Sequence, residues 1–191
     1  PLYYAFLHYW TQIFGSSEWS LRLPSALASI ANLGLMYELS KRLFNRGTAQ
    51  TAVLLLAFSP LDIWYAQEAR MYMLVTFIGL LYAISLLWVS RWRVIPLAII
   101  LITGFYLDYT AVPLLIGITI VWLVYWWRSD RHPYLLGTWS FAAIVAIIGY
   151  LPWWPQFSTL LNNLSNVHIF ADFRDLLNLP FITAQQFLLA L

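Results

Sequence analysis

The sequence contains no cysteine and very little charge. Of its 191 residues, 9% are charged and 62% are hydrophobic. The absence of cysteine excludes disulfides and thiolate metal sites. Soluble domains carry about 25% charged residues, and a chain so poor in charge cannot cover a surface that faces water. The composition therefore predicts an all-α, polytopic transmembrane helical bundle whose main solvent is lipid.

Two kinds of site are also missing from the sequence. No glycine-rich phosphate loop is present, which argues against a nucleotide site. No basic groove interleaved with aromatic residues suggests nucleic acid as a partner. The chain begins at Pro1 without methionine and ends at Leu191 inside an apolar run, so we expect it to be a fragment of a larger protein.

Six apolar stretches are candidates for membrane spans, and a seventh opens near residue 179. They cover residues 20–43, 48–63, 69–90, 94–108, 110–127 and 135–153. A spanning helix needs about 20 apolar residues. The second and fourth stretches are short, so they either tilt little or form hairpins packed inside the protein. Residues 154–178 are expected to form an outer loop.

The distribution of charge predicts which loops are cytoplasmic. Seven of the ten basic residues follow the first, third and fifth spans: Lys41, Arg42, Arg46, Arg91, Arg93, Arg128 and Arg131. The positive-inside rule places those loops in the cytoplasm. Six of the eight acidic residues lie on the opposite side: Glu18, Asp62, Glu68, Asp108, Asp172 and Asp175.

Residues 1–17 precede the first span on the outer side. Apolar residues recur there at helical spacing, while His8 and Gln12 share another face. This pattern is typical of an amphipathic helix in the membrane interface, ended by Gly15. A cap at Ser17 would open the next helix, and we expect His8 to be solvated.

The segment SPLDIWYAQEARMYML, residues 59–74, concentrates polar residues in an apolar chain. Asp62 is well placed as a helix cap after the break at Ser59 and Pro60. On a helix that continues from there, Tyr65, Glu68 and Tyr72 would share one face. Arg70 would lie about 200° around the helix from Glu68, so the two would not pair with each other.

Two interpretations of this segment remain open. In the first, Glu68 and Arg70 reach water or form tertiary ion pairs. In the second, a helix N-terminus and Arg70 bind a phosphate, and Glu68 and Tyr72 face the same cavity. Charged groups near the hydrocarbon boundary are costly, so both interpretations require partners.

Other polar residues have simpler expected roles. Glu18 and Arg22 are spaced for a local ion pair. Asp108 is expected to form a turn with Thr110 as a plausible cap, with a ligand or metal role as the alternative. The outer-loop residues His168, Asp172 and Asp175 could coordinate a cation, and Asn163-Leu164-Ser165 matches a glycosylation sequon.

Several segments together resemble a known family. PLYYAFLHYWTQIFGSSEWSLRLPSAL, SPLDIWYAQEARMYML, YLDYTAVPLL and GYLPWWPQF are similar, in this order, to segments of the protein O-mannosyltransferase-like membrane glycosyltransferases. The resemblance covers most of residues 1–160 and implies the GT-C fold. It implies inverting transfer of a sugar, of hexose (mannose) or pentose type, from a polyprenyl-phosphate donor. The acceptor would be a protein, lipid or glycan on the extracytoplasmic face.

The resemblance also suggests roles for residues. Glu68 would face the donor head group or a divalent metal ion, and Arg70 would bind the donor phosphate with Tyr72 and Gln67 beside it. Asp108 stands where the family often has histidine. Glu18, Arg22 and His8 are further candidates. The expected acidic base would precede Pro1, so the fragment alone should be inactive.

The location implied is a bacterial or archaeal plasma membrane rather than the endoplasmic reticulum. Two alternative functions remain open, namely a transporter or flippase for an amphiphilic substrate and a non-catalytic membrane scaffold. Transporters tend to place polar residues at mid-membrane on broken helices. The predicted spans here are nearly free of charge, which favours the enzyme.

Overall fold

The computed structural model describes residues 2–128, 133–155 and 158–159, and this part of the chain is helical without a strand. It confirms the expected all-α class. One compact unit comprises residues 1–150 and a second comprises residues 151–191. The first unit contains α1 (Leu2–Phe14), α2 (Glu18–Leu43), α3 (Arg46–Ala57), α4 (Pro60–Ala66), α5 (Tyr72–Leu87), the 3-10 turn η1 (Arg91–Arg93), α6 (Val94–Leu107), α7 (Ala111–Arg128) and α8 (Tyr134–Tyr150). The turn η2 (Leu151–Trp153) belongs to the second unit.

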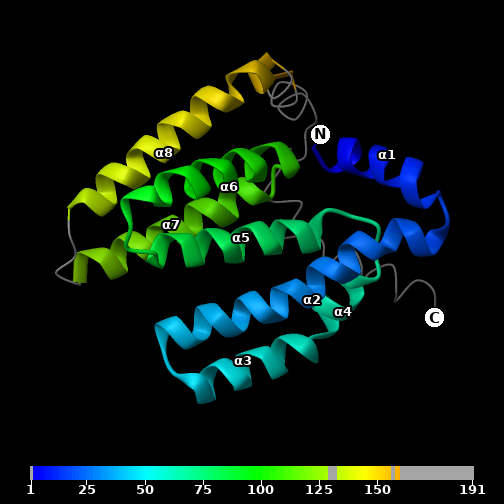
Figure 1. Ribbon diagram of the computed structural model, residues 1–191, viewed down its shortest axis with the longest axis horizontal. Coiled ribbons are helices and arrows are strands. Elements are labelled where there is room, and N and C mark those ends of the chain that lie inside the picture. Colours follow the sequence, from blue (N-terminus) through cyan, green and yellow to red (C-terminus); the bar gives the residue numbers. More distant parts are fainter. Residues whose placement is uncertain (1, 129–132, 156–157, 160–191) are drawn as a thin grey trace, which may run out of the picture. The chain divides into compact units, whose positions relative to one another are not determined.

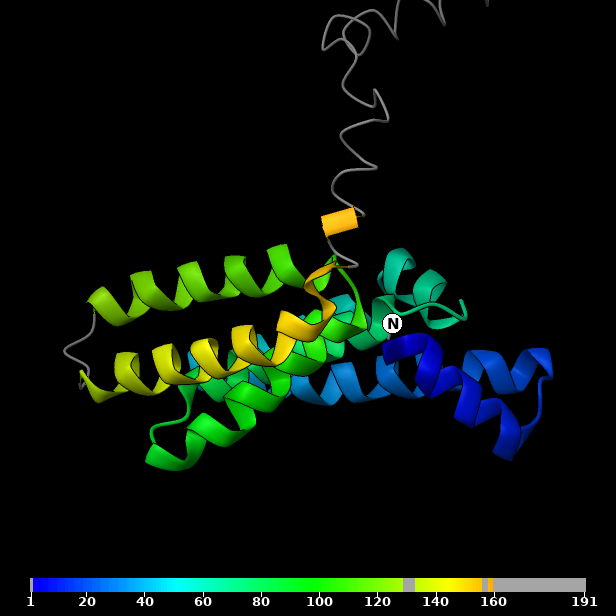
Figure 2. The same cartoon turned by 90° about the horizontal axis from the view of Figure 1, so that it is seen from above.

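The helices of the first unit pack around α5 and α6. Helix α2 packs against α3, α4 and α5, while α6 packs against α5, α7 and α8. Both views show α6 beside α8 (Figure 1, Figure 2). The most deeply buried apolar side chains come from these helices and include Tyr82, Leu86, Leu97, Leu115 and Leu135. Burial of these groups is the main favourable contribution to packing between the helices.

The connection between α1 and α2 follows the sequence prediction. Helix α1 ends before Gly15, whose φ of 79° lies in the left-handed region that favours glycine. Ser17 caps α2 by accepting a hydrogen bond from the backbone N–H of Ser20 at 3.3 Å. The indole of Trp10 donates to the Ser20 carbonyl at 2.9 Å, which fixes α1 against α2.

Two helices in the described part of the chain are long and apolar enough to cross a membrane. They are Ala111–Arg128 and Tyr134–Trp153. A third qualifies if α3 and α4 are counted as one bent span. The six expected spans each coincide with a helix or a helix pair, but α5 and α6 have only 16 and 14 residues. The expected start of a seventh span lies outside the described residues.

The expected span at 48–63 is interrupted at Ser59 and Pro60, where the sequence also indicates a break. Helix α3 ends at Ala57, and α4 begins at Pro60 with its axis bent by 60°. Proline at the first position of α4 supplies no N–H to continue the preceding helix, so the hydrogen-bond ladder stops at this point. The bend brings α4 against the N-terminal half of α2, and the polar segment follows.

Arg93 is one of the basic residues that predict the cytoplasmic loops, but it is not exposed to solvent. Its side chain is fully buried. Its guanidinium donates to the carbonyls of Leu86 and Trp88 at the end of α5, at 3.1 and 3.3 Å. The same group donates to the Leu135 carbonyl and to the Thr138 hydroxyl on α8. Arg93 thus supplies donors to carbonyls at a helix C-terminus, which otherwise lack intrahelical partners.

A second buried polar network joins α5, α7 and α8. The Tyr82 hydroxyl lies 2.7 Å from the Thr119 hydroxyl and accepts from the Trp139 indole at 2.8 Å. Thr119 also donates to the Leu115 carbonyl of its own helix at 2.8 Å. Tyr82 itself is fully buried. Polar groups at such depth stabilise a membrane bundle only when they satisfy each other.

We expect Tyr82→Phe to destabilise the protein by about 1 kcal/mol, because the Trp139 indole loses its acceptor within the bundle. The measurement is thermal unfolding in detergent, followed by circular dichroism. Tyr37→Phe is the matched control: Tyr37 is half-buried, and its hydroxyl makes no hydrogen bond within the described ranges. Equal melting temperatures for the two variants would contradict this role of Tyr82.

Candidate functional site

The polar turn after α4 faces the N-terminal end of α2 across a cavity of about 360 Å³. Its lining residues are Glu18, Leu21, Arg22, Gln67, Glu68, Ala69 and Arg70. A neighbouring hollow of about 460 Å³ shares Glu18, Arg22 and Gln67 and adds the apolar surface of Trp19, Leu23, Ala26 and Ala66. Five of the predicted candidates, from two stretches far apart in sequence, therefore lie at one place: Glu18, Arg22, Gln67, Glu68 and Arg70.

The expectation that Glu68 and Arg70 cannot pair is wrong. The Arg70 Nε lies 3.8 Å from a carboxylate oxygen of Glu68. The expectation assumed a continuous helix, but α4 ends at Ala66 and α5 begins only at Tyr72. In the intervening turn, residues two apart no longer point to opposite sides. For the same reason Tyr65, Glu68 and Tyr72 do not share one helical face, although the rings of Tyr65 and Tyr72 pack at 4.8 Å.

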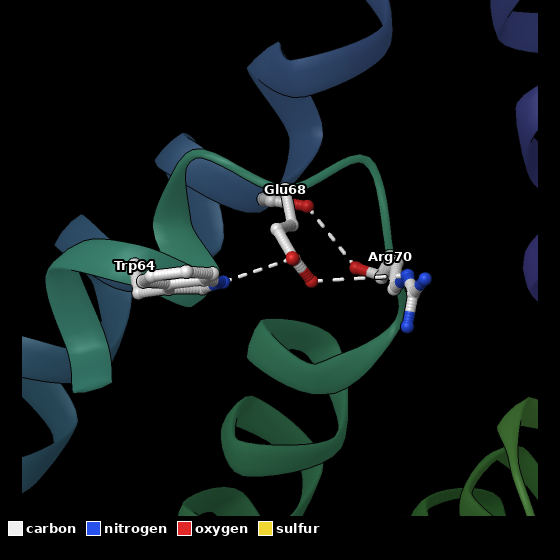
Figure 3. A network of polar contacts seen from close by, with 4 residues as sticks. Trp64, Glu68 and Arg70 are labelled. Atoms are coloured by element: carbon white, nitrogen blue, oxygen red, sulfur yellow. Dashed lines mark hydrogen bonds and ion pairs between the residues drawn. The ribbon is translucent and has the colours of Figure 1, made fainter. Parts of the chain in front are cut away.

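Glu68 is held on both of its oxygens. The indole N–H of Trp64 donates to one oxygen at 2.9 Å, and Arg70 faces the other. Figure 3 shows the carboxylate between the two side chains. Trp64 lies one helical turn before Glu68, and this spacing brings its ring edge to the carboxylate. The carboxylate is therefore fixed in orientation while Arg70 remains 63% exposed.

Arg70 stays a cation under all physiological conditions. Its pKa is raised above the usual value, first by the Tyr72 hydroxyl and then by the charge of Glu68. Its exposed guanidinium lies at the mouth of the cavity, where a planar fork of donors matches the oxygens of a phosphate. Tyr72 contacts Arg70 but is not among the residues that line the cavity, in contrast to Gln67.

Glu18 and Arg22 form the predicted local ion pair on the first turns of α2. Both side chains are largely exposed, so the pair contributes little to stability. The location of this ion pair beside the cavity matters more for function than its contribution to stability. Together with Glu68 and Arg70 it surrounds the cavity with two carboxylates and two guanidinium groups. Such a surface can donate to phosphate oxygens and accept from sugar hydroxyls.

Asp62 is not the predicted helix cap. Ser59 occupies the N-cap position of α4, and the Asp62 carboxylate accepts a hydrogen bond from the Ser29 hydroxyl at 2.8 Å. Only 8% of Asp62 is exposed. Asp62 thus ties α4 to α2 rather than capping a helix.

The structure does not bring Asp108 or His8 into the cavity. Asp108 ends α6, and its carboxylate accepts from the Thr110 hydroxyl and from the Thr110 backbone N–H at 3.4 Å. The turn predicted for Asp108 is confirmed. His8 lies exposed on α1, 3.0 Å from the Gln12 side chain with which it was expected to share a face.

The site includes residues that the sequence analysis missed. On α2, Ser25 donates to the Arg70 carbonyl at 3.1 Å and Asn32 donates to the Met73 carbonyl at 3.2 Å. With Ser29 they are spaced at i, i+4 and i+7, which places all three on one face of the helix. The sequence feature that could have identified these residues is this row of polar side chains inside an expected membrane span.

No group of three or more histidine, aspartate or glutamate residues suited to a metal ion occurs within the described part of the chain. The two carboxylates at the cavity are each paired with an arginine. A hard cation would have to displace those arginines, so this donor set does not fit a divalent metal. The outer-loop candidates His168, Asp172 and Asp175, and the sequon at residues 163–165, lie outside the described residues.

Comparison with known proteins supports the resemblance found in the sequence. No solved structure matches the chain. A curated relative from Bacillus subtilis (strain 168), "Putative mannosyltransferase YycA", is 32% identical over 75 residues, which is 39% of this chain. That match spans 11% of the relative's own length. The profile of the family described as dolichyl-phosphate-mannose-protein mannosyltransferase matches residues 1–153, and the chain therefore belongs to this family of membrane glycosyltransferases.

Proposed function

We propose that the protein of which this chain forms part transfers a sugar from a polyprenyl-phosphate donor to an acceptor on the extracytoplasmic face of a plasma membrane. The observation that carries this proposal is the cavity in which Arg70 and Glu68 meet Glu18 and Arg22. The positive-inside distribution assigns these residues to the outer side. A donor with a lipid tail presents its phosphate at that boundary, where Arg70 can reach it.

The proposed reaction is an inverting substitution at the anomeric carbon. A hydroxyl of the acceptor attacks this carbon, and the bond between it and the phosphate oxygen breaks. The polyprenyl phosphate leaves with the electron pair, so negative charge grows on its oxygens. A fixed guanidinium such as Arg70 stabilises that charge in the transition state. The acceptor proton passes to a carboxylate base.

In this scheme Glu68 orients the Arg70 guanidinium and does not take the acceptor proton. Its two oxygens are engaged by Trp64 and Arg70, so the carboxylate orients the guanidinium. A separate carboxylate base would take the acceptor proton. Gln67, which lines the cavity, contacts the donor head group, while Tyr72 contacts Arg70. No step requires a metal ion.

The test uses the whole protein in nanodiscs with two radiolabelled mannose donors, one linked to polyprenyl phosphate and one to a nucleotide. We expect the lipid-linked donor to be consumed and the nucleotide sugar to be ignored. Acceptor specificity is read by identifying the labelled product as protein, lipid or glycan. Transfer from the nucleotide sugar alone would contradict the proposal. Movement of an intact lipid across the bilayer without transfer would favour the transporter alternative.

A further inference from the structure

A row of polar side chains on α2 faces the segment that carries the candidate site. Ser25, Ser29 and Asn32 lie on one face of the helix, and each bonds to a different point of residues 59–73. Ser29 bonds to Asp62 in α4, and Asn32 bonds to the Met73 carbonyl in the first turn of α5. The middle of the segment is held by Ser25.

The hydrogen bond from Ser25 reaches a part of the segment whose backbone makes few hydrogen bonds of its own. Its hydroxyl donates to the carbonyl of Arg70 at 3.1 Å, and only 1% of Ser25 is exposed. Gln67 and Glu68 still donate to carbonyls of α4, at 3.1 and 3.3 Å. From Ala69 to Met71, no N–H makes a backbone–backbone hydrogen bond within the described ranges. The contact from α2 therefore fixes the main chain of the arginine itself.

The burial of this row argues that its positions are well defined. Asn32 is completely buried and Ser25 nearly so, and each donates a hydrogen bond to the segment, while the Asn32 Oδ1 has no hydrogen-bond partner within the described residues. The turn cannot shift along α2 without breaking these bonds. The Arg70 side chain therefore starts from a fixed backbone position. Its contacts with Glu68 and Tyr72 then set the orientation of the guanidinium.

We propose that Ser25, supported by Asn32, is a positioning residue that sets the location of the Arg70 guanidinium for the donor phosphate. The proposal rests on the proposed function, because it gives Arg70 the phosphate-binding role. Small displacements of a binding group lower catalytic efficiency strongly, since the stabilisation of the transition state depends on geometry.

The first test compares Ser25→Ala with Ser25→Thr and with Ser20→Ala in the whole protein. We expect Ser25→Ala to lower kcat/KM for the lipid-linked donor about tenfold, as expected for a misplaced binding group. Ser25→Thr keeps the hydroxyl and should restore most of the activity. Ser20 is a buried serine of the same helix whose hydroxyl has no partner within the described chain, so Ser20→Ala should have no effect.

The decisive test is a double-mutant cycle with Arg70→Ala, which removes the guanidinium and keeps the carbonyl that Ser25 contacts. If Ser25 acts through Arg70, Ser25→Ala should change kcat/KM much less in the Arg70→Ala background than in the wild type. An equal loss in both backgrounds would overturn the proposal and leave Ser25 as an ordinary packing residue.

Hydrogen exchange separates this proposal from the proposed function. The amide of Val75, whose N–H donates to the Met71 carbonyl at 2.9 Å, should exchange faster in Ser25→Ala than in Ser20→Ala, whether or not sugar is transferred. Faster exchange with unchanged kcat/KM would overturn the positioning role while the proposed function stands. If the whole protein transfers no sugar, the proposed function fails, and the exchange rates alone decide whether Ser25 holds the turn.

Discussion

Replacing Arg70 with alanine is expected to lower kcat/KM for transfer from a polyprenyl-phosphate sugar by about 10²–10³-fold, the usual cost of removing a preorganised group at a site of developing charge. The guanidinium is exposed at the cavity, and the Glu68 carboxylate that orients it is itself held by Trp64. The measurement is initial-rate kinetics of the whole protein in nanodiscs.

Two variants make this result specific. Arg70→Lys keeps the charge but loses the planar fork, so we expect an intermediate loss. Glu68→Gln removes the charge that faces Arg70, and we expect it to abolish most of the transfer while expression is unchanged. Full activity in both Arg70→Ala and Glu68→Gln would exclude this cavity as the donor site.

Replacing Arg93 with methionine is expected to destabilise the protein by at least about 3 kcal/mol, since each buried acceptor left without a donor costs about 1–3 kcal/mol. Methionine retains much of the side-chain volume, so the loss reports hydrogen bonding rather than a cavity. The carbonyls of Leu86 and Trp88 at the end of α5 would lose this donor, whereas the Leu135 carbonyl would keep the Thr138 hydroxyl. Arg93 also stacks over the Trp122 ring, 5.4 Å from its centroid.

The control for this measurement is Arg42→Met. Arg42 is an exposed arginine whose partner is Glu38 on the same helix, 2.7 Å away. Exposed pairs of this kind contribute less than about 1 kcal/mol. Both variants are compared by chemical unfolding in detergent. A loss for Arg93→Met no larger than that for Arg42→Met would show that the buried contacts do not hold α5 and α8 together.

Much of the helical order could be predicted from the sequence, because helix limits in an apolar chain are marked by charge, proline and glycine. Gly15 and Ser17 ended and began helices as predicted. The sequence indicates a break at Ser59 and Pro60, but not the 60° bend found there. A helical wheel assumes continuity, so the interruption between Ala66 and Tyr72 caused the error about Glu68 and Arg70.

The buried roles of polar residues could not be predicted from the sequence. Arg93 has the same local context as other inner-loop cations, and only tertiary packing places its guanidinium among carbonyls of two helices. Ser25 and Arg70 are 45 residues apart, and no local rule links a hydroxyl on one helix to a carbonyl in a distant turn. The ion pair between Glu18 and Arg22 was predictable because both partners lie on one helix.

The matched charges around the cavity have a consequence for how a ligand arrives. Glu18 and Glu68 offset Arg22 and Arg70, so the four charges that line the cavity sum to zero. A neutral group of charges produces a field that decays quickly, and salt screens what remains. An anionic ligand is therefore not drawn in from a distance. It would be delivered by lateral diffusion within the bilayer, and its encounter rate should depend little on ionic strength.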